Sequence, residues 1–185
     1  MHDPEAQRSY FKNHLDTRRF RAGLGLLFSP LWLRGMYSPA LVSCLPPHFG
    51  AVLKQRMERC FALHPNRSNP YARALLEGWV PKTEGATVPG GAASRIELVT
   101  NDAAAYLEQC PSAGFEGLSL SNILDGATPS YRERLIVAVR RAAKRNATVV
   151  RRSFGEPSPG LATNRAEDDR SMLWGIVDVR PVEAL

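Results

Sequence analysis

The chain has 185 residues, of which 44% are hydrophobic and 23% are charged, and its formal net charge is +6. These values exclude general disorder, and the length is sufficient for one sizeable core or two small ones. The positive charge is carried mostly by arginine, which suits phosphate and carboxylate partners. Because the arginines occur in short clusters and no long basic arm is present, we expect no nucleic-acid partner.

The N-terminus and the cysteines indicate a reducing, cytoplasmic setting. The first residues, MHDPEAQRSYFKNH, are polar and charged where a secretory signal needs an apolar region. Cys44, Cys60 and Cys110 are odd in number and far apart, so they predict neither a disulfide framework nor a zinc knuckle. The four histidines are dispersed, so no metal site is predicted.

Residues 1–80 are predicted to form a helical segment. In its middle part, Val52, Leu53, Met57 and Phe61 fall on one side of a helix. Several prolines are expected to divide this half into short helices; they lie at positions 30, 39, 46, 47, 65 and 70.

The most apolar stretch is AGLGLLFSPLWL, residues 22–33. It is too short to span a bilayer and is interrupted by Pro30. Two interpretations remain: a buried core helix, which general frequency favours, and a helix lying on a membrane surface, peripheral to its inner face.

Residues 81–94 are rich in Gly and Pro and are predicted to be a loop or linker, and beyond them the pattern changes to strands alternating with helices. This alternation predicts an α/β unit over residues 95–185 with a partly parallel sheet. The expected strands are 95–100, 117–121 and 147–154, with a last strand or hairpin arm within 171–182. The strand 117–121, between 95–100 and 147–154, is expected to be the central one. The expected helices are 101–110, capped by Asn101 or Asp102, and 129–146, with Pro129 near its first turn.

Small polar residues gather where the strand GLSLS ends: Ser119, Ser121, Asn122 and Asp125. Ligands of open α/β sheets bind outside the carboxyl ends of the strands, so this cluster is a candidate site. The alternative is that Asn122 and Asp125 only form turn and capping hydrogen bonds before the next helix.

Three separated motifs, SLSNILD, VVRRS and DDRSMLWG, occur in an order that resembles the S-adenosylmethionine:diacylglycerol 3-amino-3-carboxypropyltransferase family of betaine-lipid synthesis. The N-terminal runs FKNHLDTRRFR, LFSPLWLRGMY and HPNRSNPYARALLEG resemble the helical segment of that family. The resemblance implies the C-terminal part of a class I S-adenosylmethionine-dependent transferase fold, which is Rossmann-like, preceded by a helical segment.

The resemblance also implies a reaction and its residues. A lipid hydroxyl attacks the γ-carbon of the aminocarboxypropyl group of S-adenosylmethionine, which requires alignment and a base. Asp125 is the candidate base, and Ser121 and Asn122 are candidates to orient the substrate or the amino-acid moiety. For Asn122 and Asp125 the alternative remains turn and capping chemistry.

The resemblance also implies residues that contact the cofactor S-adenosylmethionine. Asn101 or Asp102 is expected to approach the adenine; the alternative is helix capping, and the two roles are compatible in space. Ser119 is a further cofactor candidate, and Arg151 is expected to pair with the cofactor carboxylate unless it faces solvent.

The chain departs from the family in one respect. The Gly-rich turn after a first strand and the acidic end of a second strand are missing, and Gly90-Gly91 follows no apolar strand. We therefore expect the downstream part of such an enzyme, with its missing strands compensated by a partner chain, by a different strand pairing or by loss of function. The alternative function is a catalytically silent binding or regulatory module that associates with a transferase subunit or a membrane surface.

Overall fold

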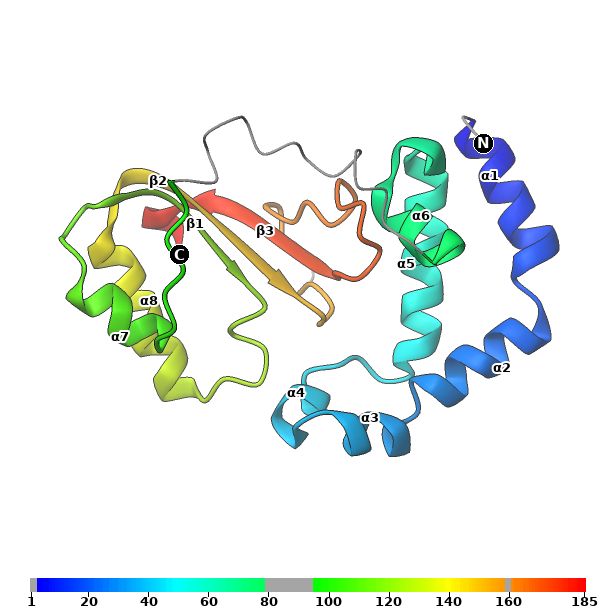
Figure 1. Ribbon diagram of the computed structural model, residues 1–185, viewed down its shortest axis with the longest axis horizontal. Helices are drawn as coiled ribbons and strands as arrows, with labels where there is room; N and C mark the ends of the chain where they lie inside the picture. Colours follow the sequence, from blue (N-terminus) through cyan, green and yellow to red (C-terminus); the bar gives the residue numbers. More distant parts are fainter. Residues whose placement is uncertain (1–2, 79–94, 159–160) are drawn as a thin grey trace.

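The computed structural model describes residues 3–78, 95–158 and 161–185, so the predicted linker at 81–94 lies outside the described residues (Figure 1). Within residues 1–80, predicted to be helical, the described residues 3–78 contain helices and their connections and no strand. The elements of this segment are α1 (Pro4–Tyr10), the π-helix η1 (Phe11–Leu15), α2 (Arg18–Leu27), α3 (Pro30–Met36), α4 (Pro39–Ser43), α5 (Phe49–Leu63), the 3-10 turn η2 (Asn66–Ser68) and α6 (Pro70–Glu77).

Proline and a preceding capping residue define many of the helix starts. Helices α1, α3, α4 and α6 each have a proline in the first turn, where its missing N–H costs no helical hydrogen bond. The capping side chains just before these prolines accept hydrogen bonds from first-turn N–H groups; they are Asp3, Ser29, Ser38 and Asn69. The prolines therefore divide this half as predicted, by starting helices.

Helix α5 carries the core of the helical segment. Leu53, Met57 and Phe61 are buried on the predicted side, and Phe11 packs edge-on against Phe61 with ring centroids 5.4 Å apart. Met172, from the far end of the chain, joins the same core. The helical segment and the C-terminal loop therefore share one apolar cluster.

The interpretation of residues 22–33 as a buried core helix is wrong. Helix α2 has no buried residue and α3 buries only Leu33. Leu26, Leu27 and Leu31 are largely exposed. The stretch forms two short helices because Pro30 starts a new helix capped by Ser29.

The C-terminal part is a small α/β unit. Its elements are α7 (Ala103–Gln109), β1 (Phe115–Ser121), α8 (Pro129–Ala142), β2 (Ala143–Ser153), β3 (Ile176–Pro181) and the 3-10 turn η4 (Val182–Ala184). The sheet order is β1-β2-β3, with β1 parallel and β3 antiparallel to β2. Helices α7 and α8 pack on one face of this sheet around Leu107, Leu135, Val139 and Val149 (Figure 1).

Three expectations for the α/β unit need correction. Residues 95–100 form no strand and pair with no described strand; Leu98 is 92% exposed. The strand at 117–121 was expected to be central, but β1 is an edge strand and β2 is the central one. Helix α8 ends at Ala142, so residues 143–146 belong to β2. Apolar alternation indicates a strand, but whether the strand forms, and whether it lies at the edge or the centre of the sheet, depends on the neighbouring strands.

Candidate functional site

The candidate site lies at the carboxyl end of β1, where the chain turns sharply toward α8. Ser121 has a φ of +46°, and Asp125 N–H donates to the Asn122 carbonyl oxygen at 2.9 Å, closing a turn. The Ser121 hydroxyl donates a long hydrogen bond of 3.5 Å to Asn122 Oδ1. Ser121 is exposed and Asn122 is half-buried, so both side chains are accessible to a ligand.

Asp125, the candidate base, connects the loop after β1 to the end of β2. The Ser153 hydroxyl donates to Asp125 Oδ1 at 2.6 Å, and the Phe154 N–H donates to Oδ2 at 2.9 Å. These partners lie outside its own turn and the following helix, so the carboxylate joins two strand ends. It retains lone pairs that can accept a proton.

Helix α4 covers part of the same loop. Gly126 N–H donates to Cys44 Sγ at 2.9 Å. Gly126 has a φ of +75°, and a Cβ there would lie only 2.9 Å from the Ala40 carbonyl carbon. A glycine is therefore required, and the strand ends are in contact with the helical segment.

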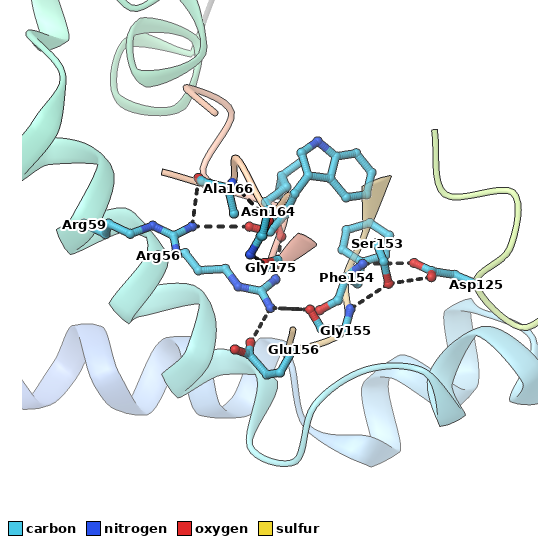
Figure 2. Close-up of polar contacts among 12 residues, drawn as sticks. Arg56, Arg59, Asp125, Ser153, Phe154, Gly155, Glu156, Asn164, Ala166 and Gly175 are labelled. Atoms are coloured by element: carbon cyan, nitrogen blue, oxygen red, sulfur yellow. Dashed lines mark hydrogen bonds and ion pairs between the residues drawn. The ribbon is translucent and has the colours of Figure 1, made fainter. Parts of the chain in front are cut away.

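On the other side of this junction, arginines of α5 hold the loop that follows β2. Arg56 is 3% exposed and donates to the carbonyl oxygens of Leu173 and Phe154 at 2.6 and 2.8 Å. Figure 2 shows Arg56 and Arg59 extending from α5 toward this loop while Asp125 approaches Ser153 from the opposite side. Burial lowers the pKa of Arg56, and pairing with the Glu156 carboxylate opposes that shift.

Arg151, predicted to bind the cofactor carboxylate, already has a carboxylate partner. Its guanidinium lies 3.2 Å from Asp178 Oδ2 on the adjacent strand β3. Asp178 is 1% exposed, pairs also with Arg180 at 2.7 Å and accepts a hydrogen bond from the Thr163 hydroxyl at 2.6 Å. A ligand carboxylate would have to compete with Asp178 for Arg151.

Asn101 and Asp102 lie at the start of α7. Asp102 caps this helix, as predicted, by accepting from Ala105 N–H at 2.8 Å, and its own N–H donates to Asn101 Oδ1. The bond from Ala105, followed by one from the Tyr131 hydroxyl, lowers the pKa of Asp102. Tyr131 belongs to α8, so the described contacts of Asp102 link the starts of α7 and α8.

Ser119 is exposed, and its hydroxyl accepts a hydrogen bond from Arg152 at 3.1 Å. The predicted site residues therefore fall into two groups, those whose polar groups are accessible to a ligand and those held by internal contacts. Ser119, Ser121 and Asn122 present accessible polar groups that fit a polar ligand, whereas Asp125 and Arg151 are engaged in internal contacts.

An apolar groove lies beside this junction, within the helical segment. Its volume is about 990 Å³, and it is lined by residues of α2 to α5 that include Leu24, Phe28, Leu33, Val42 and Phe49. Val42 precedes Cys44, which contacts the loop after β1. The groove is within the size range of small-molecule sites and is predominantly hydrophobic.

Sequence reasoning missed Asp178, Ser153 and Arg56. Asp178 interrupts the apolar run Ile176–Val179, and Arg56 falls on the apolar side of α5 beside Leu53 and Met57. A charge at a core position was the available signal, because such a charge needs a partner. Ser153 carried no comparable signal.

Comparisons with models of protein families, with curated proteins and with solved structures found no match to this chain. Within residues 3–78, 95–158 and 161–185, no group of three or more His, Cys, Asp or Glu side chains is placed to hold a metal ion. Nor is any helix in this part of the chain long and apolar enough to cross a bilayer. Burial raises the pKa of Cys60 to about 11, so this thiol stays protonated at neutral pH and is a poor nucleophile.

Proposed function

We propose that this chain takes part in S-adenosylmethionine-dependent transfer of a 3-amino-3-carboxypropyl group to the hydroxyl of a diacylglycerol-type lipid, at the cytoplasmic face of a membrane. The observation that carries the proposal is the accessible Ser121-Asn122 turn at the carboxyl end of β1, next to the Asp125 carboxylate. Ligands of α/β sheets bind at such strand ends. The motif SLSNILD, on which the family resemblance partly rests, forms this turn.

In the proposed reaction, the lipid hydroxyl oxygen forms a bond to the γ-carbon of the transferred group. The bond from that carbon to the sulfonium sulfur breaks, its electron pair stays on sulfur, and neutral methylthioadenosine leaves. Asp125 takes the hydroxyl proton, while Ser121 and Asn122 orient the amino-acid moiety by hydrogen bonds. The apolar groove between α2 and α5 supports a lipid acceptor because its lining suits an acyl chain.

The proposal includes a partner strand. In the described chain, β1 pairs only with β2, so its other edge is open. Residues 95–100 are exposed and lack a strand partner among the described residues. A partner chain that adds strands here would cover the open edge of β1.

Mass spectrometry of lipid extracts tests the reaction. The full chain is incubated with S-adenosylmethionine and diacylglycerol-containing vesicles, and we expect the aminocarboxypropyl lipid and methylthioadenosine in equal amounts. Asp125→Asn should remove product while circular dichroism reports an intact fold, and Ser112→Ala, at an exposed position after α7, should have no effect. Full turnover by Asp125→Asn would remove Asp125 as the base.

A second function is favoured by a specific observation. Asp125 and Arg151 are already engaged with Ser153 and Asp178, as expected for structural rather than catalytic groups. The chain would then be a catalytically silent module that associates with a complete transferase subunit. Absence of both product and cofactor binding supports this second function.

A further inference from the structure

Helices α2 and α3, with Tyr37 just after α3, expose several large apolar side chains. Trp32 is 51% exposed and Leu31 is 86% exposed. Together with the other exposed apolar residues of these helices they form what we call the α2–α3 patch: Leu26, Leu27, Leu31, Trp32, Met36 and Tyr37. Soluble surfaces rarely gather this many large apolar side chains unless they bind something.

Basic residues accompany the patch, and acidic residues are missing from it. Arg18, Arg19 and Arg34 are exposed, and none of them forms an ion pair with another residue in the described ranges. From Thr17 to Met57 the sequence contains no aspartate or glutamate. The region is therefore both apolar and uniformly positive.

The carboxylate that directly precedes this stretch in the sequence is engaged by other cations. Asp16, just before α2, accepts hydrogen bonds from Arg21 at 2.7 Å and from Lys54 of α5 at 3.1 Å. Its negative charge is thus neutralised where α2 joins α5. It does not offset the arginines beside the patch.

We propose that the α2–α3 patch docks onto an anionic lipid bilayer, with its apolar side chains entering the interface and the arginines meeting lipid phosphates. Exposed Trp, Tyr and Leu side chains with arginines on the same helices are the chemistry of interfacial helices. A second copy fits poorly, because a symmetric interface would oppose arginine with arginine without a carboxylate to separate them. Arg18, Arg19 and Arg34 provide the attraction that an anionic surface needs.

Vesicle cosedimentation tests this surface and needs neither S-adenosylmethionine nor diacylglycerol, so its result is independent of the transfer reaction. The full chain is mixed with vesicles of phosphatidylcholine alone or of phosphatidylcholine with phosphatidylglycerol. We expect binding to the mixed vesicles to be at least tenfold tighter, and to weaken as salt is raised from about 0.1 to about 0.5 M.

Two sets of variants separate the apolar and the charged contributions. Leu31→Ser combined with Trp32→Ser should weaken binding to mixed vesicles about tenfold or more, whereas Val137→Ser, 63% exposed on α8, should leave it unchanged. Arg18→Gln, Arg19→Gln and Arg34→Gln together should also weaken it about tenfold or more, while Arg145→Gln, exposed on β2, should not. Circular dichroism checks that each variant is folded.

Three results would overturn the proposal. One is absence of wild-type binding to mixed vesicles, and another is equal binding to both kinds of vesicle. The third is a wild-type dimer on size-exclusion chromatography that the Leu31→Ser/Trp32→Ser variant converts to monomer while vesicle binding persists. That result would make the patch an interface between copies.

Discussion

The hydroxyl of Ser153 donates a 2.6 Å hydrogen bond to Asp125 Oδ1, and this contact joins the loop after β1 to the end of β2. Together with the Phe154 N–H bond to Oδ2, it gives one carboxylate two donors from a neighbouring strand end. The same carboxylate is the candidate base, so its structural and catalytic contributions need separate measurements.

Replacing Asp125 with alanine should lower the free energy of unfolding by about 2 kcal/mol, because the Phe154 N–H loses its acceptor in a partly buried site. Chemical denaturation measures this. Ser153→Ala should cost less, since the carboxylate keeps its second donor, and the double variant should be less destabilised than the sum of the two. Strict additivity would mean that the two side chains do not interact in solution.

Asp178 is the buried charge on which the end of the sheet depends. Asp178→Asn should lower the free energy of unfolding by about 3 kcal/mol, because Arg151 and Arg180 then face each other without a counter-ion. Glu116→Gln is the matched control: the Glu116 side chain is 81% exposed and pairs with Lys144 at the surface, so a much smaller loss of stability is expected. Equal effects of both substitutions in thermal or chemical unfolding would contradict the burial of Asp178.

Gly175 packs closely against the Arg56 guanidinium and the Gly155 carbonyl group. A Cβ at this position would overlap the Gly155 carbonyl oxygen and the Arg56 guanidinium, so Gly175→Ala should be destabilising by about 2 kcal/mol. Gly35→Ala is the control, since nothing lies within 4 Å of its Cβ position in α3, and it should be neutral or stabilising by up to about 1 kcal/mol. A neutral Gly175→Ala would mean that α5 and this loop are not packed as described.

The ion pairs of Asp16 predict an acid-dependent loss of stability. The hydrogen bond from Arg21 lowers the pKa of Asp16 from 3.8 to about 2 in the folded chain. The contribution is therefore present above about pH 4 and is lost as the pH falls toward about 2. The difference in unfolding free energy between wild type and Asp16→Asn, about 1 kcal/mol near neutral pH, should shrink over that interval. A constant difference would contradict the lowered pKa.

Local features of the fold could be predicted from the sequence, because capping and proline chemistry act over a few residues. Asp102 caps α7 and Pro129 begins α8, as expected. The apolar alternation in residues 95–100 predicted a strand that does not form, because a strand also requires a neighbouring strand to pair with. The edge position of β1 likewise depends on which strands lie beside it.

In the candidate site, too, local features could be predicted from the sequence and long-range contacts could not. Ser121, Asn122 and Asp125 were identified from their position after an apolar run, and they do occupy the turn that ends β1. The partners of Asp125 and Arg151 could not be identified in the same way. Ser153 and Asp178 are each more than 20 residues away along the chain, and only folding brings them into contact.

Calorimetric titration of the full chain with S-adenosylmethionine tests the proposed transfer function most directly. The account predicts a saturable heat that Ser121→Ala combined with Asn122→Ala weakens at least tenfold, while Ser112→Ala leaves it unchanged. Because Ser121 is exposed and Asn122 half-buried, the double variant should remain folded. No heat at about millimolar cofactor would contradict the account and leave the catalytically silent module as the function of this chain.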